Sequence, residues 1–379
     1  MEFKHSEDRQ MLANTLGRYL SDHYDFQTRV QIATSDAGWS RDRWMALAEL
    51  GIVGALFDDQ SGGFGGSGFD IAAVFEQLGR ALVVEPYLGT LMAGRVIARA
   101  AQHQDLLDQV IAGSKVLAFA HEEPRSHYDL AAVTTHAQEA NGGWVVTGTK
   151  AVVPQLAAAD HILVSARTQG QGVADDAVGM ALLLVDKGAK GLDVRRYPLL
   201  DGGCGGDLIL NATPALLIAE DGYPLIEEAV ATGIVALTWE AVGIMDELLA
   251  STLEYLRTRK QFGVPIGKFQ ALQHRIATVA LEVEQARSAA INVAAALGGE
   301  RRQRERSASA AKFTVGRVGT LTAEEAIQMH GGIGMTWELP LSHFAKRLVM
   351  IGHQLGDEDH HIARYISLGR ETDTRSTEP

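Results

Sequence analysis

Cysteine is nearly absent from this sequence, since Cys204 is the only one in 379 residues. A single thiol cannot close an intramolecular disulfide or supply the paired cysteines of a zinc site. Long apolar runs are also missing, because no stretch approaches the ~20 residues that span a bilayer. The first ten residues, MEFKHSEDRQ, are polar and lack the apolar core of a secretory signal. We therefore expect a cytoplasmic protein with no integral membrane segment.

Positive charge is in deficit. The chain has 34 Lys and Arg against 47 Asp and Glu, which gives a formal net charge of −13. A nucleic-acid backbone repels such a surface, so no nucleic-acid partner is expected. Hydrophobic residues make up 46% of the chain, which is ordinary for a folded protein and is enough, at this length, for two or three domains.

Helical patterns fill the first part of the chain. In EDRQMLANTLGRYLSDHY, apolar residues recur at spacings of three and four, which is typical of an amphipathic helix. Ser40 is expected to cap the helix RDRWMALAEL, with Gly51 just past its end. FDIAAVFEQLGRALVVEP is expected to stay helical up to Pro86. The glycine-rich DDQSGGFGGSGFD lacks the Lys-Ser/Thr of a phosphate loop, so it is interpreted as a connection. These patterns predict an all-helical domain over residues 1–114.

From about residue 115 the pattern changes to short segments rich in apolar and β-branched residues. Examples are SKVLAFAHEE, GGWVVTGTKAVVP, HILVSART and GMALLLVDK, separated by Gly, Asp, Asn or Pro. Such segments are typical of strands, and they predict a small β-sandwich or barrel over residues 115–220.

Residues 221–379 return to helical patterns. The stretch from Pro224 through RTRKQFG is interpreted as one very long amphipathic helix, followed by two more long helices, a shorter one and a polar tail. Long antiparallel helices predict a four-helix bundle. The predicted fold is therefore α+β, with an N-terminal helical domain, a middle β-sandwich or barrel and a C-terminal four-helix bundle.

Two stretches resemble the acyl-CoA dehydrogenase family. RTRKQFGVPIGKFQALQHRIA (257–277) and QMHGGIGMTWELPLSHFAKRL (328–348) are similar to its C-terminal flavin-binding segments, and RWMALAELGIVGALFDDQSGGFGG resembles its N-terminal domain. The order of helices, strands and helices fits that family over essentially the whole chain. The resemblance implies FAD as cofactor, an acyl-CoA thioester as substrate, a trans-2-enoyl-CoA as product and an electron-transfer flavoprotein as electron acceptor.

The same resemblance implies which residues hold FAD. Arg259 offers a planar fork of donors that suits the pyrophosphate. Gly331 and Gly332 let backbone amides approach the cofactor closely, because neither carries a Cβ. Three further positions match residues that line FAD in the family: Phe262, Gln270 and Gln328. In relatives these groups reach the flavin of a neighbouring subunit, which implies a dimer or a tetramer.

The middle domain departs from the family pattern. Relatives have Thr-Glu-Pro where this chain has EEP within HEEPRSHYD, so Glu122 stands in place of the Thr. Val152 and Pro154 stand where relatives have a Trp that shields the flavin and a Thr that hydrogen-bonds it. These departures resemble the small subunit of pimeloyl-CoA dehydrogenase, which often pairs with a larger homologous subunit. We therefore expect either a homotetramer or an α2β2 tetramer, with a dicarboxylyl-CoA as one candidate substrate.

The stretch QLGDEDHH (354–361) gathers three carboxylates and two imidazoles. Many acyl-CoA dehydrogenases place their catalytic Glu immediately before the glycine of this segment, and the matching residue here is Leu355. No metal is expected, because the family reaction uses none and nothing upstream supplies a matched ligand pair. The acidic residues 357–359 are expected in the first turn of a helix, where the helix dipole favours anions. Three histidines are interpreted as structural rather than acid–base groups: His121, His330 and His353.

The missing base moves the catalytic hypothesis to Glu240. In some relatives the carboxylate comes from the long helix before RKQFG, at the position of Gly233 here. Glu240 lies seven residues further on, a shift of about 10 Å at the rise of a helix. Small residues share its edge of the apolar stripe, which leaves room for a thin acyl chain: Ala229, Gly233 and Ala236.

Three alternatives stay open at this point. Glu240 is a helix residue paired with an Arg or Lys, in which case a partner subunit supplies the base. The chain is a half-site or non-catalytic subunit of a heteromeric acyl-CoA dehydrogenase. The chain is a flavoenzyme of the same fold with another chemistry, such as an oxidase.

Overall fold

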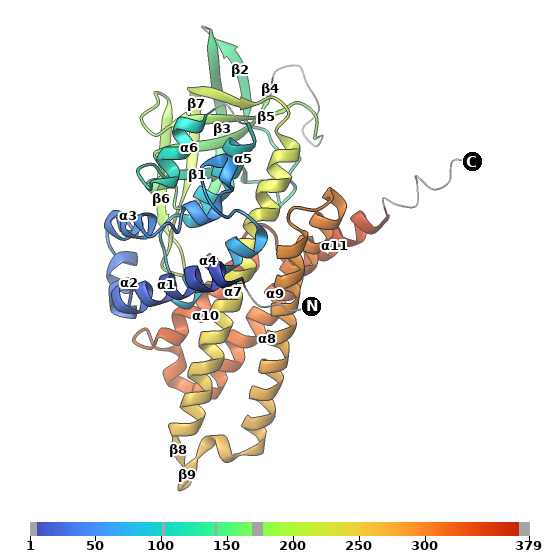
Figure 1. The fold of residues 1–379 in the computed structure, drawn as a ribbon. Helices are drawn as coiled ribbons and strands as arrows, with labels where there is room; N and C mark the ends of the chain where they lie inside the picture. Colours follow the sequence, from blue (N-terminus) through green and yellow to red (C-terminus); the bar gives the residue numbers. More distant parts are fainter. Residues whose placement is uncertain (1–5, 101–102, 141, 169–176, 371–379) are drawn as a thin grey trace, which may run out of the picture. The chain divides into compact units, whose positions relative to one another are not determined.

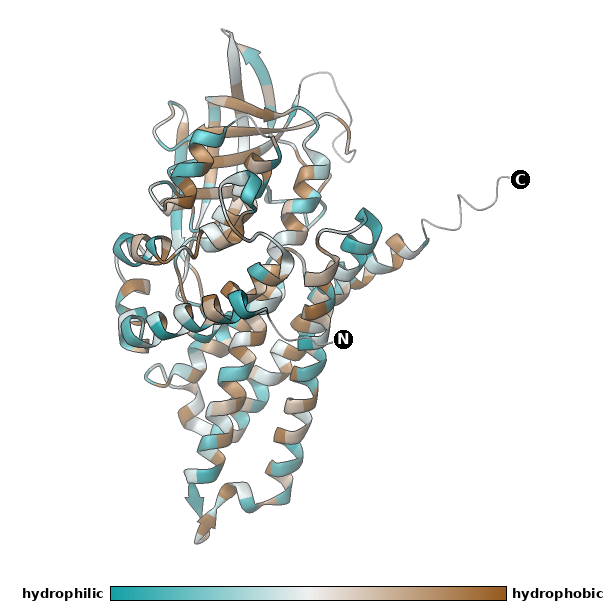
Figure 2. Ribbon diagram, viewed as in Figure 1, coloured by the Kyte–Doolittle hydropathy of each residue, from teal (hydrophilic) through white to brown (hydrophobic). Residues whose placement is uncertain are grey.

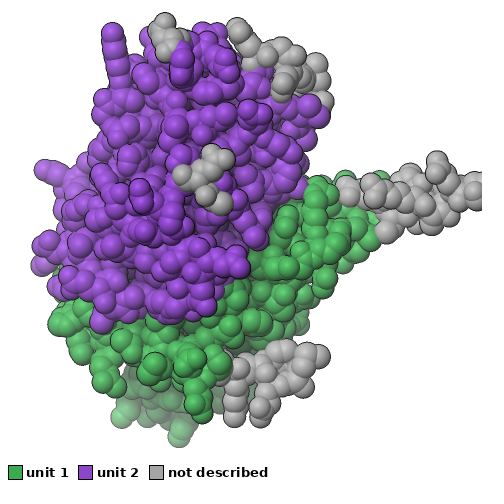
Figure 3. All heavy atoms as spheres, turned by 45° about the horizontal axis from the view of Figure 1, so that its top comes forward, with its two compact units in different colours: residues 1–27, 67–83, 234–379 green, residues 28–66, 84–233 purple. Residues whose placement is uncertain are grey.

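The computed structural model describes residues 6–100, 103–140, 142–168 and 177–370, and its elements run from helices to strands and back to helices (Figure 1). The chain divides into two compact units (Figure 3). Unit 1 comprises residues 1–27, 67–83 and 234–379, and unit 2 comprises residues 28–66 and 84–233. The predicted polar tail, ETDTRSTEP, lies outside the described residues.

Unit 2 contains a closed sheet. Its strands are β1 (Leu117–Ala120), β2 (His136–Ala140), β3 (Gly143–Pro154), β4 (His161–Thr168), β5 (Met180–Asp186), β6 (Leu192–Pro198) and β7 (Cys204–Ala219). They pair in the order β1-β4-β2-β3-β7-β5, with β6 beside β7, and β5 pairs back onto β4. This last pairing closes the ring, which removes two free edges. The predicted β-domain is therefore a barrel.

Apolar side chains fill the inside of this barrel. The buried residues come from most strands and include Val146, Ile162, Val164, Leu183 and Leu208. Figure 2 colours several segments of these strands brown, for hydrophobic residues. Burial of such aliphatic side chains contributes on the order of 1.5–3 kcal/mol each relative to exposure. The short β-branched segments of the sequence thus supply a continuous core.

Four helices of the N-terminal third lie wholly or mainly in unit 2: α2 (Phe26–Ala33), α3 (Arg41–Glu49), α5 (Tyr87–Ala100) and α6 (Gln104–Ile111). Ser40 caps α3 as predicted, since its hydroxyl accepts from the Arg43 amide. Gly51 follows α3 with a φ of 81°, which glycine adopts without strain. The N-terminal helices thus divide between the two units.

Unit 1 is helical. It contains α1 (Glu7–His23), α4 (Gly68–Arg80), α8 (Gln270–Ala296), α9 (Arg301–His330), α10 (Pro340–His353), α11 (Glu358–Arg370) and most of α7 (Tyr223–Thr258). Helix α9 packs against α8, α10 and α11. Helix α7 is long and apolar enough to pass a test for membrane spans, but 94% of its most apolar window is buried inside the protein. It therefore resembles the core helix of a soluble protein.

Helices α4 and α7 touch backbone to backbone. A Cβ on Gly79 would lie 2.2 Å from the carbonyl oxygen of Glu240, and a Cβ on Gly243 would lie 2.2 Å from that of Glu76. Both distances are far below van der Waals contact. Glycine at both positions is therefore what allows this close crossing.

Two helix ends differ from the sequence expectation. The helix expected to continue to Pro86 ends at Arg80, and Leu82 then adopts a φ of 52°. The helix expected to run through RKQFG ends at Thr258, because the next residues form a two-stranded hairpin, β8 (Lys260–Gln261) and β9 (Val264–Pro265). In both places a local turn ends the helix although the apolar pattern continues.

Candidate active site

The six residues expected to hold FAD meet at one end of the helical bundle. Phe262 and Gly263 form the two-residue turn of the β8–β9 hairpin, with φ values of 52° and 82°. Positive φ at both positions is the signature of a type I′ turn, in which glycine is favoured. The Ile266 amide donates to the Arg259 carbonyl at 2.8 Å and closes the hairpin. Gln270 then opens α8.

The second FAD segment begins in the last turn of α9. Gln328 lies in that turn, and Gly331 caps the helix with a φ of 70°. A Cβ on Gly331 or Gly332 would meet no atom within 4 Å. The two glycines therefore leave open space beside the end of α9, although the Gly331 amide itself donates to the Ile327 carbonyl.

All six residues are exposed on the single chain: Arg259, Phe262, Gln270, Gln328, Gly331 and Gly332. The Phe262 ring is 92% exposed. An aromatic ring so fully in water stabilises nothing within its own chain. The position of these residues suits contact with a molecule or subunit outside this unit.

The stretch QLGDEDHH is the start of a helix. Asp357 accepts a hydrogen bond from the His360 amide at 2.9 Å, and Glu358 and Asp359 occupy the first turn of α11, as predicted. Among the described residues, no group of three or more His, Cys, Asp or Glu could hold a metal ion. Leu355 precedes this helix with a φ of 58° and Gly356 with a φ of 109°.

A buried lysine and a buried histidine donate hydrogen bonds to the backbone of this segment. Lys312, on α9, is 1% exposed and donates to the carbonyls of Gly352 at 3.0 Å and Gly356 at 2.7 Å. Burial lowers the pKa of Lys312 to about 7, against the opposing effect of Asp357 and Glu358. The Nε2–H of His361 donates to the Leu355 carbonyl at 2.9 Å. Three backbone carbonyls around Leu355 are thus fixed by side chains.

Glu240 is buried on α7 and is paired with an arginine. Its side chain is 8% exposed, and Arg347 on α10 donates from Nε to Oε1 at 2.6 Å and from Nη2 to Oε2 at 2.8 Å. Arg347 also donates from Nη1 to the Gln354 side chain at 3.0 Å. The guanidinium therefore joins Glu240 to the residue directly before Leu355. Bidentate pairs of this kind are strong and well oriented.

The barrel carries a second buried ion pair, in unit 2. Lys150 is 0% exposed and donates to Glu123 at 2.8 Å, to Ser165 at 2.9 Å and to the His121 carbonyl at 3.0 Å. Burial alone would raise the pKa of Glu123, but Lys150 lowers it to about 2. Glu123 also accepts from the Thr134 and Thr135 amides. Glu123 and Lys150 of the EEP and GTK motifs thus fix the loop that follows β1.

The residues that depart from the family lie beside this pair. The Glu122 carboxylate accepts from the Ser126 hydroxyl at 2.9 Å, and burial raises its pKa. Val152 has a φ of 52°, is 56% exposed and donates its amide to Asp207 at 3.2 Å. Neither side chain supplies the hydroxyl or the indole that the family resemblance leads one to expect there.

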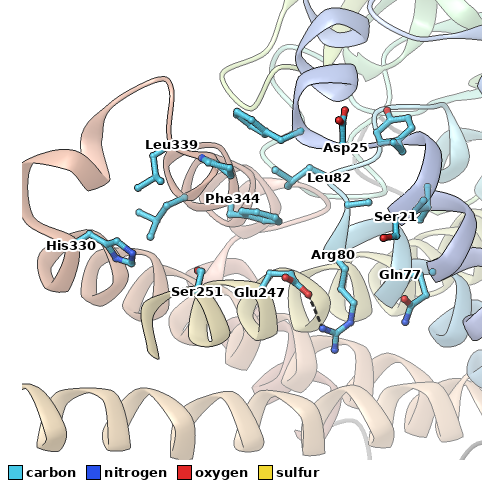
Figure 4. Close-up of a pocket in the computed structure, with 17 residues that line it drawn as sticks. Ser21, Asp25, Gln77, Arg80, Leu82, Glu247, Ser251, His330, Leu339 and Phe344 are labelled. Carbon is cyan, nitrogen blue, oxygen red and sulfur yellow. Dashed lines mark hydrogen bonds and ion pairs between the residues drawn. The ribbon is translucent and has the colours of Figure 1, made fainter. Parts of the chain in front are cut away.

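Unit 1 also contains a cavity of about 600 Å³, whose lining includes Leu20, Gln77, Leu82, Ser251 and Phe344 (Figure 4). Its charged wall is Arg80, which bonds Glu247 at 3.0 Å and Glu76 at 3.1 Å. Arg80 also pairs with Asp246. Because carboxylates already surround this guanidinium, the cavity does not offer the free cation that a phosphate or a carboxylate ligand requires.

Three profiles of one family match the chain. The N-terminal, middle and C-terminal domains of acyl-CoA dehydrogenase match residues 6–114, 118–204 and 220–359. The chain belongs to the acyl-CoA dehydrogenase family. It is 27% identical over 345 residues to the acyl-CoA dehydrogenase IpdE2 of Mycobacterium tuberculosis, covering 90% of this chain and 91% of that protein.

Solved structures agree with this family. The steroid acyl-CoA dehydrogenase Tcur3481-Tcur3483, as its G363A variant, is 30% identical and has a TM-score of 0.88 over 97% of this chain and 99% of that chain. A structure of PigA with FAD and proline is 24% identical, with a TM-score of 0.87 over 97% of this chain and all of that chain. The second likeness concerns the fold alone.

This acyl-CoA dehydrogenase is therefore a flavin-dependent oxidoreductase that acts on CH–CH bonds, with FAD as its cofactor. The residues present fit FAD, since the exposed Arg259 guanidinium and the open space beside Gly331 and Gly332 lie at the same end of the bundle. When bound, FAD supplies the acceptor for the hydride. The predicted fold, family and cofactor are confirmed, whereas the roles of the individual site residues stay predictions.

Sequence reasoning missed the partners of the key residues. Arg347 lies 107 positions from Glu240, and Lys312 lies 44 positions from Gly356. No local pattern marks either residue, because each is one cation within an ordinary helix. Only the folded arrangement of α7, α9 and α10 joins them to the segment around Leu355.

Proposed function

We propose that this protein catalyses the α,β-dehydrogenation of an acyl-CoA thioester. A base removes the α-proton, the β-hydrogen leaves as hydride to FAD, and the product is a trans-2-enoyl-CoA. The reduced cofactor then passes its electrons to an electron-transfer flavoprotein. The observation that carries this proposal is the exposed set of FAD residues in a chain of this family. Fatty acyl-CoA and dicarboxylyl-CoA thioesters are the substrate classes to compare.

The FAD residues and Glu240 serve two different sites in this proposal. Eighteen positions of α7 separate Glu240 from Thr258, which is about 27 Å of helix. Arg259 follows directly after this helix end, so it lies far along the bundle from the carboxylate. We infer that the exposed FAD residues of one chain reach the cofactor of a neighbouring chain. A tetramer, either homomeric or α2β2, satisfies this requirement.

Glu240 is the proposed base. Its carboxylate is buried, and Arg347 links it to Gln354, beside the position at which relatives carry their catalytic Glu. Arg347 also limits this role, because both carboxylate oxygens already accept from the guanidinium. For proton abstraction, Glu240 must use a lone pair that Arg347 does not occupy.

A half-site subunit is the second candidate. Four positions that face the reacting centre in relatives have lost the expected group: Glu122, Val152, Pro154 and Leu355. The six FAD residues that reach a neighbour are all retained. This division favours a chain that completes the flavin site of a larger homologous subunit and leaves the base to that subunit. The name of the solved relative Tcur3481-Tcur3483 also joins two components.

Anaerobic reduction by acyl-CoA thioesters tests the proposal. The chain is purified alone and after co-expression with a larger homologue from its own genome, and native mass spectrometry gives subunit masses and flavins per chain. Bleaching of the flavin in the chain alone supports the enzyme. Bleaching that requires the homologue, with fewer flavins than chains, supports the half-site subunit. Bound flavin that no thioester reduces in either preparation excludes both.

Arg259→Ala is the matched variant for the cofactor. Loss of a charge-assisted contact typically costs about 1.5–3 kcal/mol, so the variant is expected to purify with much less flavin. Lys268→Ala, an exposed lysine of the same connection, is the control and keeps its flavin. Unchanged FAD affinity in Arg259→Ala contradicts the assignment of this residue.

A cytoplasmic location is part of the proposal and is tested by cell fractionation.

A further inference from the structure

We propose that Tyr255 and His330 form a clasp that positions the two FAD segments relative to each other. The inference rests on the proposed role in binding FAD of six residues: Arg259, Phe262, Gln270, Gln328, Gly331 and Gly332. In this proposal, neither Tyr255 nor His330 needs to contact the cofactor. Both are positioning residues, since they act on FAD through Arg259 and through Gly331 and Gly332.

The two rings lie at the ends of the helices that carry the FAD segments. Tyr255 stands one turn before the end of α7, and His330 is the last residue of α9. Their ring centroids are 4.3 Å apart with an interplanar angle of 25°, a stacked pair. Such stacked rings attract each other beyond the burial of their area. The stack therefore joins the two helix ends directly.

The clasp also fixes the backbone of both segments. The Tyr255 hydroxyl donates to the His330 carbonyl at 3.3 Å, which orients the peptide that leads into Gly331. The Arg259 amide donates to the Tyr255 carbonyl at 2.8 Å. The Tyr255 side chain thus holds the peptide before Gly331, and its backbone carbonyl continues the helical hydrogen bonding into Arg259.

His330 is itself held firmly. Its Nδ1–H donates to the Ala326 carbonyl at 2.8 Å, and the residue is 7% exposed, between the buried Met329 and the exposed Gly331. Gly334 packs against it, since a Cβ there would lie 3.1 Å from the His330 Cβ. His330 and Met329 are both buried, whereas Gly331 and Gly332 are exposed. The buried His330 ring anchors the turn that contains Gly331 and Gly332.

An ion pair also lies near the FAD segments. Arg275 and Glu325 also connect α8 to α9, at 2.6 and 2.9 Å, but the Arg275 side chain is 45% exposed. That ion pair joins α8 to α9, whereas the stacked pair joins α7 to α9 and lies directly beside Arg259 and Gly331.

The test measures FAD affinity and folding separately. The dissociation constant of FAD is measured by fluorescence titration of apo-protein, well below the melting temperature, for His330→Ala, His330→Phe and Tyr255→Phe. Circular dichroism and the melting temperature of each apo-protein report folding. Tyr365→Leu is the control, because it removes a ring that stacks under Arg306 at 4.5 Å on another helix of the same unit.

His330→Ala is expected to raise the FAD dissociation constant at least tenfold. His330→Phe keeps a ring in the stack and stays within about threefold, and Tyr365→Leu leaves the constant unchanged. At saturating FAD, the rate of flavin reduction in Tyr255→Phe returns to the wild-type value, because this variant removes only the bond to the His330 carbonyl. An FAD affinity of His330→Ala within threefold of wild type overturns the clasp.

Two further measurements distinguish a variant that fails to fold, a wrong clasp and a wrong FAD site. If His330→Ala does not fold, Tyr255→Phe decides, because it removes only the bond to the His330 carbonyl. A rise of threefold or more in its FAD dissociation constant supports the clasp, and no rise overturns it. Arg259→Ala is measured in parallel. Weakened binding in Arg259→Ala with intact binding in the clasp variants removes the clasp and leaves the proposed function standing.

Discussion

At the scale of single residues, the most informative contact is the pair between Glu240 and Arg347. The burial of Glu240 is consistent with a catalytic base. Its bidentate pairing with Arg347 is consistent with a structural role. The two interpretations predict different kinetics. A structural Glu can be replaced without a change in the chemical step, provided that FAD is retained.

Glu240→Gln is expected to slow flavin reduction by the best acyl-CoA at least ~tenfold. General-base removal typically costs a factor of 10² or more, and the amide keeps the shape of the side chain. The measurement is single-turnover reduction with the FAD content confirmed equal to wild type. A smaller loss shows that Glu240 is structural and that the base comes from elsewhere. Glu305→Gln is the control, since Glu305 is also buried and paired with arginines.

Lys312 predicts how stability depends on pH. Its pKa is about 7 in the folded protein and about 10.5 in the unfolded chain. Between these values the unfolded state binds more protons, so the free energy of unfolding rises with pH from about 7 to about 10. One group can supply at most about 1.4 kcal/mol per pH unit. Neutral lysine still has two N–H groups, enough for its two carbonyl bonds.

Urea denaturation at pH 7, 8 and 9 checks this prediction. Lys312→Met is expected to be less stable overall, because two carbonyls lose their donor, and to lose the rise with pH. Lys268→Met, at an exposed lysine, keeps the rise. A wild-type stability that falls over this range, or a rise that persists in Lys312→Met, contradicts the assignment.

At the scale of elements, the crossing of α4 and α7 depends on two glycines. Gly79 and Gly243 each lie against a carbonyl of the opposite helix. A methyl group at either position must push the helices apart, and overpacking of this kind typically costs about 1–3 kcal/mol.

Gly243→Ala is therefore expected to lower the free energy of unfolding by about 1–3 kcal/mol, although alanine is the better helix former. Gly352→Ala is the matched control, because this helical glycine has no atom within 4 Å of a Cβ. It is expected to be neutral or slightly stabilising. Equal effects at the two positions would show that the α4–α7 crossing relaxes freely.

Most elements could be predicted from sequence, and the exceptions share a cause. The barrel strands follow from β-branched segments, and α3 follows from its Ser40 cap. The ends of α4 and α7 could not be predicted, because turns at Leu82 and Phe262 use positive φ in residues that rarely adopt it.

The candidate site was predictable only in part. The FAD motifs carry a family pattern, so their positions follow from sequence. The ion pair of Glu240, the lysine beneath Leu355 and the Tyr255–His330 stack each join residues more than 40 positions apart. Such contacts depend on how helices pack, and one sequence without homologues carries no signal for them.

At the scale of the whole molecule, the exposed apolar surface of unit 1 predicts an oligomer. Several large side chains of this unit are exposed: Phe262, Leu281, Ile333, Met335, Trp337, Ile362 and Ile366. Monomers rarely leave so many apolar side chains in water, and the FAD residues are exposed alongside them.

We expect a dimer of dimers that persists on dilution to nanomolar concentration. Native mass spectrometry and mass photometry measure the mass, and FAD occupancy is followed at each dilution. Dissociation into smaller species is expected to release FAD, because the site borrows groups from two chains. A monodisperse monomer with one FAD per chain contradicts this prediction and the shared site together.

The carbonyl contacts around Leu355 hold the backbone at this position independently of the side chain it carries. Lys312 donates to the Gly356 carbonyl and His361 to the Leu355 carbonyl, so neither bond uses the side chain at position 355. A substitution here therefore changes the side chain and leaves these hydrogen bonds of the loop in place. Leu355→Glu is then expected to put a carboxylate where the family resemblance expects one, on a loop that needs no rebuilding.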